Sequence, residues 1–323
     1  MKRTAAVCAL VALVAACGDG NPFTDNAEDT GEETPIDPTD PEVDPLAVPA
    51  AILGDLESIS FNADDNTLTV TGLTQEGTPF DNSYTAVASS FAPGYQTFTA
   101  QNDAIGRHAT AFVASRDGVQ AGMVLTGPQF NEVFGGTFYE RDGEYVAPTA
   151  PESRFDVTYF GNYAAGLNGP GPETDLLTQS PGVDPDVSVP TQAAYITGLM
   201  FINVDLNDFS VEGEVFDRTA FLRSGTQDLP DIVLIEGTLT DEGTFSGNIE
   251  LDETDPDFPG VDAQDIGDFA GVIGGPDGNA VAGGTTIENF SDDFENEIEF
   301  GVFVLDLCDA SSTDPICVNA LQP

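Results

Sequence analysis

The sequence predicts an all-β protein, in which a disordered tether and a small N-terminal β subdomain precede an eight-stranded antiparallel barrel. Three observations lead to this prediction. From Ile52 onward, apolar and polar residues alternate in short runs, which is the period of a strand. Turn residues separate these runs, and no long stretch has the helical period of about 3.6 residues. Before Ile52 the chain is acidic and rich in Pro and Thr, so it cannot bury a core.

The first residues predict secretion followed by lipidation. Lys2 and Arg3 precede a short apolar run, Ala5 to Ala16, and a membrane span needs about 20 residues. The run ends in Val14-Ala15-Ala16-Cys17, which resembles a bacterial lipobox, where the Cys thiol takes a diacylglycerol. We therefore expect a lipoprotein signal peptide at 1–16 and a lipid anchor, with acyl chains such as palmitate, on Cys17. The alternative is an ordinary signal peptide with an incidental Cys.

Residues 17–48 form the predicted tether. Its acids repel one another and its prolines stiffen it, so we expect an extended spacer that holds a folded domain off the membrane. If Cys17 is counted as the first residue of the mature chain, the second is Gly18 and not Asp, which favours export to the outer membrane.

Charge and composition exclude several functions. The chain has 56 Asp and Glu against 8 Lys and Arg, a net charge of −48, so nucleic acid and anionic lipid surfaces repel it. It has one His, and its only Lys lies in the leader. We expect that the protein is not an enzyme. The weak candidates for chemistry are Glu212 and Glu214, which flank Gly213, and His108, which we expect to be structural or exposed.

The small β subdomain is expected at 49–150. A turn at Asp64-Asp65-Asn66 precedes a strand that starts near Leu68. Asp-Gly pairs at 117–118 and 142–143 predict two tight hairpins, because type I′ turns need positive φ angles. The second of these hairpins would pair residues 136–140 with residues 144–147.

The barrel is expected at 151–323. Eight strands are predicted near 155–162, 193–204, 209–217, 231–240, 244–251, 267–274, 279–287 and 297–305. In the fifth of these, Phe245, Ile249 and Leu251 share one face with Gly247. Closing eight strands into a barrel removes the open edges that a flat sheet would leave.

Several segments resemble the barrel of transferrin-binding protein B-like surface lipoproteins. The hairpin Phe269-Ala270-Gly271-Val272-Ile273-Gly274-Gly275-Pro276-Asp277-Gly278 and the strand Tyr159-Phe160-Gly161-Asn162-Tyr163-Ala164 carry the resemblance, which covers about residues 155–305. Here Val272-Ile273 replaces the family's Phe-Tyr, and the chain has one barrel where the iron-acquisition receptors have two lobes. The resemblance implies a surface lipoprotein that binds a protein or nutrient, and it transfers no ligand-contact residue.

The cysteines predict one disulfide. Cys8 leaves with the leader and Cys17 is assigned to the lipid, so Cys308 and Cys317 are the pair that remains in an oxidising compartment. We expect their bond to hold the C-terminus against the barrel.

Three connections are candidate binding segments. Arg218, Phe221, Leu222 and Arg223 are expected in an interstrand loop that contacts a partner, because Arg and aromatic residues are favoured interface anchors. Residues 167–192 form a long, Pro-rich connection. The loop Asp252–Asp262 clusters carboxylates, and we expect it to be a solvated loop, because the whole protein is acidic; we expect no cofactor and no metal. The weaker alternative is a Ca²⁺ site, since hard oxygen ligands suit this ion.

These features together predict a lipid-anchored surface protein that captures a protein or nutrient ligand without catalysis, together with an outer-membrane receptor. The alternative is a structural or adhesion barrel that binds no small ligand.

Overall fold

The computed structural model describes residues 44, 46–72, 82–88, 90–130, 132–150, 154–178, 189–259, 261, 263–290 and 296–322. Cys17, the signal peptide and most of the predicted tether lie outside the described residues. Residues Asp44–Pro323 form one compact unit. In the described part of the chain, no helix has the length and apolar character needed to cross a membrane.

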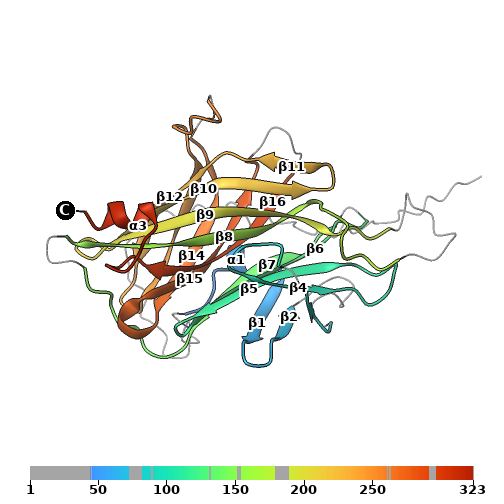
Figure 1. The fold of residues 1–323 in the computed structure, drawn as a ribbon, viewed down its shortest axis with the longest axis horizontal. Coiled ribbons are helices and arrows are strands. Elements are labelled where there is room, and N and C mark those ends of the chain that lie inside the picture. Colours follow the sequence, from blue (N-terminus) through green and yellow to red (C-terminus); the bar gives the residue numbers. More distant parts are fainter. Residues whose placement is uncertain are drawn as a thin grey trace, which may run out of the picture. The chain divides into compact units, whose positions relative to one another are not determined.

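Eight antiparallel strands close into a barrel, which confirms the predicted fold class (Figure 1). Each strand pairs with the next in the chain, and the first also pairs with the last. The strands are β8 (Asp156–Pro170), β9 (Ala193–Asp205), β10 (Ser210–Leu222), β12 (Ile232–Leu239), β13 (Thr244–Leu251), β14 (Asp265–Gly274), β15 (Ala280–Glu288) and β16 (Ile298–Leu307).

Two barrel strands, β8 and β10, continue well past their predicted ends. Strand β8 continues to Pro170, through a stretch rich in Gly and Ala that lacks the β-branched pattern of a strand. Strand β10 continues to Leu222, where it forms a short hairpin with β11 (Gly225–Asp228). The segment 218–222 is therefore a paired strand, and the prediction that it forms a loop was wrong.

Apolar side chains fill the inside of the barrel. Tyr159, Phe269 and Phe303 are fully buried there, and each of the other barrel strands also contributes one apolar face to this core. Strand β13 contributes Phe245, Ile249 and Leu251, the face that the sequence predicted. The interior is a packed core, so a ligand has to bind outside it.

A five-stranded sheet lies beside the barrel. Its strands are β3 (Thr85–Ala86), β4 (Gln96–Ala100), β5 (Ala109–Arg116), β6 (Val119–Thr126) and β7 (Gly135–Arg141), in that order. The predicted turn between β5 and β6 is present, with φ angles of 47° at Asp117 and 85° at Gly118.

The prediction of a second hairpin in this region was wrong. Residues 144–147 do not pair with β7 and instead cross to the barrel. Arg141 donates hydrogen bonds to the carbonyls of Glu242 and Ile273, and Tyr145 packs against the turn at Gly243, where a Cβ would lie 2.3 Å from its ring. These tertiary contacts outweigh the local turn signal.

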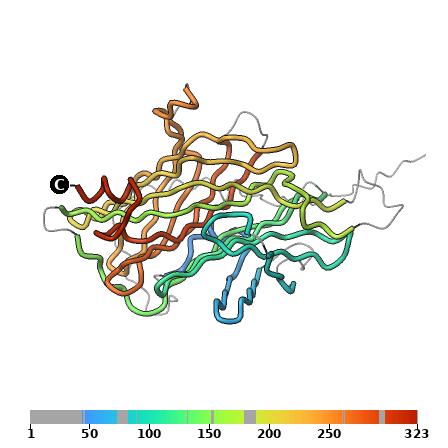
Figure 2. Tube along the Cα trace, viewed as in Figure 1, coloured from blue at the N-terminus to red at the C-terminus, as the bar shows by residue number. Residues whose placement is uncertain are grey.

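The sheet packs between the barrel wall and a hairpin (Figures 1 and 2). Phe112, Met123 and Leu125 face Ala and Val side chains on the outside of the barrel. At Gly166 of β8, a Cβ would lie 2.5 Å from the Met123 methyl, so the Gly- and Ala-rich strand allows this close approach. The other face of the sheet is covered by β1 (Leu56–Asn62) and β2 (Thr67–Gly72).

The described chain begins before residue 49. Leu46 and Val48 pack against the core between sheet and barrel, just ahead of the short helix α1 (Ala50–Leu53). The tether boundary at residue 48 and the division at residue 150 both fall within one compact unit, and they stay predictions.

Candidate functional site

The side chains of the predicted partner segment make contacts within the protein. Arg218 is 1% exposed. The ring of Phe221 stacks on Tyr195 with 4.6 Å between centroids, and Leu222 packs on the barrel core. Arg223, whose side chain is half exposed, forms an ion pair with Glu173. The structure thus separates the four residues, and their role in partner binding stays a prediction.

Arg218 belongs to a polar cluster inside the barrel. Its guanidinium bonds to Glu299 Oε2 at 2.6 Å and to the carbonyl of Pro230 at 2.6 Å. The Tyr163 hydroxyl donates to Glu299 Oε1 at 2.6 Å and lies 2.8 Å from the Thr285 hydroxyl. Burial and the adjacent carboxylate raise the pKa of Tyr163 well above its usual value, which keeps this donor protonated.

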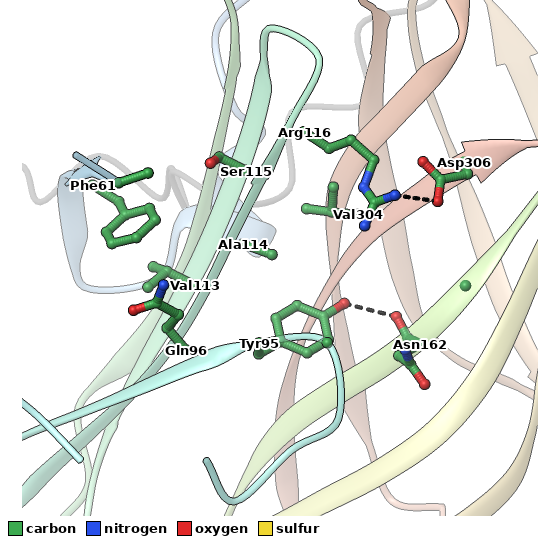
Figure 3. A pocket seen from close by; sticks show the side chains of 13 residues that line it. Phe61, Tyr95, Gln96, Val113, Ala114, Ser115, Arg116, Asn162, Val304 and Asp306 are labelled. Atoms are coloured by element: carbon green, nitrogen blue, oxygen red, sulfur yellow. Dashed lines mark hydrogen bonds and ion pairs between the residues drawn. The ribbon is translucent and has the colours of Figure 1, made fainter. Parts of the chain in front are cut away.

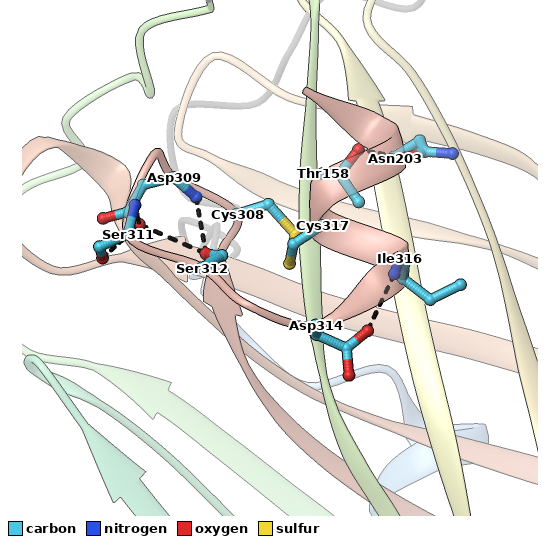
Figure 4. The surroundings of a disulfide bond; sticks show 9 residues. All are labelled: Thr158, Asn203, Cys308, Asp309, Ser311, Ser312, Asp314, Ile316 and Cys317. Atoms are coloured by element: carbon cyan, nitrogen blue, oxygen red, sulfur yellow. Dashed lines mark hydrogen bonds between the residues drawn. A yellow bond between two sulfur atoms is a disulfide. The ribbon is translucent and has the colours of Figure 1, made fainter. Parts of the chain in front are cut away.

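The predicted disulfide is present. Cys308 follows β16, and Cys317 lies on the helix α3 (Pro315–Ala320), with 5.0 Å between their Cα atoms (Figure 4). The Asp314 carboxylate accepts a hydrogen bond from the Ile316 amide and so caps this helix. The Cys308 amide donates to the Thr158 carbonyl at 2.8 Å, which attaches the bridge to β8. The bridge therefore fastens the C-terminal segment to the barrel.

One carboxylate of the acidic loop at 252–262 forms hydrogen bonds within the protein. The Asp255 carboxylate is buried and accepts hydrogen bonds from the amides of Asp231 and Asp257. Burial, and next the charge of Asp255, raise the pKa of Asp231 to about 6. Among the described residues, no three acidic, His or Cys side chains are grouped to hold a metal, and Asp262 lies outside them. The expected solvated loop and its alternative, a calcium site, both stay predictions.

The two acids on β10, Glu212 and Glu214, lie in different surroundings. Glu212 is exposed, whereas Glu214 is half-buried. Burial raises the pKa of Glu214, and the charges of Asp231, Asp252 and Asp255 raise it further.

His108 is buried directly before β5, and among the described residues neither of its ring nitrogens has a hydrogen-bond partner, so it is not the hydrogen-bonded histidine that a structural role would predict. Its Nε2 lies 3.6 Å from Asp175 Oδ2, and burial lowers the pKa of the imidazole. The Thr99 hydroxyl also donates to Asp175. These contacts join the connection between β8 and β9 to the five-stranded sheet.

Three connections meet at this end of the sheet. The side-chain amide of Gln129 donates to the Ile105 carbonyl at 2.9 Å, which joins the β6–β7 and β4–β5 connections. The Leu177 amide donates to Gln101 Oε1 at 2.8 Å, which joins the β8–β9 connection to them. The described part of each connection presents one large exposed apolar residue. They are Ile105 (55% exposed), Phe130 (61%) and Leu177 (47%), which we call the tip surface.

Phe130 is held in an unusual conformation. It lies at the tip of a tight turn in which the backbones of Gln129 and Glu132 pair at 3.1 and 3.2 Å. Its φ of 57° is the left-handed region that bulky residues avoid. The tip surface was not predicted from the sequence. Its signal is the lone large apolar residue at 105 and at 130, each set among turn-forming residues.

A groove lies at the other end of strand β5. Its first hollow, of about 250 Å³, separates the sheet from the barrel (Figure 3). Val113 and Ala114 of β5 line one side, and Asn162 and Val304 of the barrel line the other. A second hollow of about 320 Å³ continues past the turn between β5 and β6. The two hollows share Phe61, Ser115 and Arg116, and we call them together the β5 groove.

No family model and no curated protein matches this chain. Similar solved structures include a double mutant of transferrin-binding protein B from Haemophilus parasuis (14% identity, TM-score 0.39). They also include intact Ap-TbpB, with both lobes (13% identity, TM-score 0.38), and the isotype 1 protein from serogroup B Neisseria meningitidis (13%, 0.33). The matches cover 74%, 78% and 75% of this chain, which spans 42%, 46% and 38% of those proteins. The family indicated by the barrel residues is thus also the family that these structures represent.

Proposed function

We propose that this chain is a lipid-anchored protein of the outer-membrane surface that captures a protein ligand without catalysis. The observation that carries the proposal is the tip surface, where three joined connections expose Ile105, Phe130 and Leu177. Exposed apolar residues grouped on loops are typical of protein interfaces, and aromatic residues contribute most to their affinity. The packed barrel interior favours an external ligand of this kind.

Charge defines the partner further. Asp103, Glu132, Glu173 and Asp175 lie on the same three connections, where Glu132 pairs with Arg107 and Glu173 with Arg223, and the whole chain carries a net charge of −48. A basic protein surface with an apolar pocket complements this arrangement, because opposite charges speed the encounter and apolar contact retains the complex. The sequence resemblance makes transferrin one protein to test, and an outer-membrane receptor would act on the captured ligand.

The test uses the full chain, purified from membranes and immobilised through its C-terminus. Transferrin and the proteins of the growth medium are passed over the wild type, over Phe130→Ser and over the control Phe155→Ser, which alters an exposed Phe at a different end of the barrel. We expect one retained protein whose binding falls at least about tenfold in Phe130→Ser and is unchanged in Phe155→Ser. Equal binding by all three proteins would refute the tip surface. Retention of no protein would favour the structural or adhesion barrel.

The anchor needs a separate test. We expect a clickable palmitate analogue to label the wild type, and Cys17→Ala to abolish the label and release the protein from membranes. Label on both proteins, or on neither, would contradict lipidation at Cys17.

A further inference from the structure

The one histidine of the chain, His108, is a buried base close to the tip surface. It is 1% exposed, and in the described part of the chain neither of its ring nitrogens has a hydrogen-bond partner. The hydroxyl of Thr110, two residues further on, is buried without a partner as well. Buried polar groups are normally hydrogen-bonded, because leaving them unsatisfied is unfavourable. A structural role alone therefore does not explain a histidine at this position.

Asp175 is the charged residue that acts on this imidazole. Its Oδ2 lies 3.6 Å from His108 Nε2, which is longer than a hydrogen bond. The same carboxylate oxygen accepts a hydrogen bond from the Thr99 hydroxyl of β4. The carboxylate is thus close enough to attract a charged ring, but it does not bond to the neutral one.

The other charged residues of the neighbouring connections are engaged elsewhere. Arg107 donates to the carbonyl of Glu132 and lies 3.8 Å from its carboxylate. The Asp103 carboxylate accepts hydrogen bonds from backbone amides of its own turn. Glu173 forms an ion pair with Arg223. Among the described residues, a proton taken up by the imidazole therefore meets a single carboxylate within ion-pair distance.

Charging the buried ring is unfavourable in this arrangement. An imidazolium has two N–H donors, and the described surroundings offer it one carboxylate at 3.6 Å. Burial lowers the pKa of His108 below its ordinary value of 6.5, and the opposing effect of Asp175 is smaller. A ring that reaches water titrates at about 6.5. The arrangement that buries the ring is therefore fully stable above pH 6.5 and loses stability as the pH falls below this value.

The part of the β8–β9 connection beside the ring also carries one residue of the tip surface. This stretch is joined to the sheet at Asp175, and the Leu177 amide donates to Gln101 Oε1 at 2.8 Å. The backbone of His108 is fixed, because its carbonyl accepts a hydrogen bond of 2.9 Å from the Gly127 amide. A charged ring thus reaches water when the stretch at 174–177 moves away, and the tip surface then loses one of its three apolar residues.

We propose that His108 makes the tip surface pH-dependent: protonation of its ring detaches residues 174–177 from the sheet and weakens the retention of a bound protein. This inference rests on the proposed function, since the tip surface is where that protein would bind. At neutral pH the ring is uncharged and the tip surface is assembled. In an acidic medium the ring becomes charged, and the captured protein is released.

The first measurement uses the free full chain and needs no ligand. Because the chain has one histidine, protein labelled with ¹³C-histidine and prepared without a histidine tag gives a single imidazole signal in NMR spectra. We expect this signal to titrate with a midpoint below pH 6.5. Asp175→Asn removes the carboxylate that favours the charged ring, so it should lower the midpoint further. The control Glu173→Gln, on the same connection, should leave the midpoint unchanged.

The second measurement follows the connection itself. Hydrogen–deuterium exchange of peptides that span residues 171–178 is compared at pH 7.5 and pH 5, after correction for the intrinsic effect of pH. The wild type should lose protection about tenfold at pH 5, whereas His108→Leu, which cannot be charged, should keep it. The ring forms no hydrogen bond that Leu would lose, so this variant should fold at both pH values. His108→Gln, which is neutral and polar, is the second variant.

Retention of the captured protein is then compared at the same two pH values. We expect it to be about tenfold weaker at pH 5 for the wild type and nearly unchanged for His108→Leu. If no protein is retained at either pH, the proposed function fails, while the titration and the exchange still decide whether the switch exists. The switch is overturned by a midpoint at or above pH 6.5, by equal or greater protection of residues 171–178 at pH 5, or by equal losses of protection in the wild type and both His108 variants.

Discussion

Arg218 and Glu299 lie 81 residues apart in the sequence and form a 2.6 Å ion pair inside the barrel, where both side chains are fully buried. Strand β10 carries the Arg and β16 the Glu, on different sides of the closed sheet. Because Tyr163 and Pro230 satisfy further bonding positions, the pair is a specific polar contact in an apolar core.

Removing one partner of the Arg218–Glu299 pair should lower the free energy of unfolding more than replacing both partners by apolar residues. Arg218→Met leaves the Glu299 carboxylate buried without its cation, and we expect the free energy of unfolding to fall by about 3–5 kcal/mol. Combining Arg218→Met with Glu299→Leu should recover most of this loss, because no uncompensated charge then remains. Urea denaturation of the wild type, both single variants and the double variant measures the coupling. A double variant whose loss equals the sum of the single losses would contradict the prediction.

The disulfide should stabilise the folded chain without being required for it. Cys308→Ser combined with Cys317→Ser should lower the free energy of unfolding by roughly 1–3 kcal/mol, since the closed loop is short and the barrel core is large. Helix α3 should fray first, and proteolysis near residue 315 should accelerate. Mass spectrometry that finds two free thiols in the unreduced wild type would refute the bridge.

Phe130 should make the protein less stable than a residue that tolerates positive φ would, and it should contribute to binding of the protein ligand. The left-handed backbone at this residue is strained for Phe and tolerated by Asn. We therefore expect Phe130→Asn to raise the free energy of unfolding by about 0.5–1 kcal/mol and to lower ligand retention. The matched control is Ile105→Asn, which removes an exposed apolar residue without a positive φ and should leave stability within about 0.5 kcal/mol. Loss of stability in Phe130→Asn would show that the ring is a structural residue.

The carboxyl of Asp231 should make stability depend on pH. Burial and the charge of Asp255 raise its folded pKa to about 6, above the value of 3.8 for a free Asp side chain. The folded state thus binds this proton more tightly than the unfolded state. Its contribution is fully present below pH 3.8 and is lost as the pH rises through 6. Since the group is partly exposed, we expect a loss on the order of 1 kcal/mol between pH 4 and 7.

Asp231→Asn tests this assignment, because the amide cannot titrate. We expect the variant to be more stable than the wild type at pH 7.5 and equal to it or less stable near pH 4. Asp228→Asn, which alters an exposed carboxylate on the neighbouring strand β11, is the control. Melting curves recorded from pH 4 to 8 at constant ionic strength measure the difference. Parallel pH profiles for the wild type and Asp231→Asn would exclude Asp231 as the titrating group.

The sequence by itself determined the strands, most of the turns and the disulfide. Apolar residues at Phe245, Ile249 and Leu251 alternate with polar ones, a period of two that is typical of a strand with one buried face. Asp117-Gly118 suits a turn that needs positive φ angles. Cys308 and Cys317 were identified by elimination, because few cysteines were left to pair. The strand and turn signals are local, so they can be read from neighbouring residues, and the disulfide follows from the count of cysteines in the whole sequence.

Only the tertiary structure decided where the candidate sites lie. The tip surface needs three connections from distant parts of the chain, and the β5 groove needs β5 beside β8 and β16. The same packing buried Arg218 and extended β10 through the segment predicted as a loop. Residues with no local signal meet at these places because barrel closure and the docked sheet bring them together. Propensity over a few residues does not contain that information.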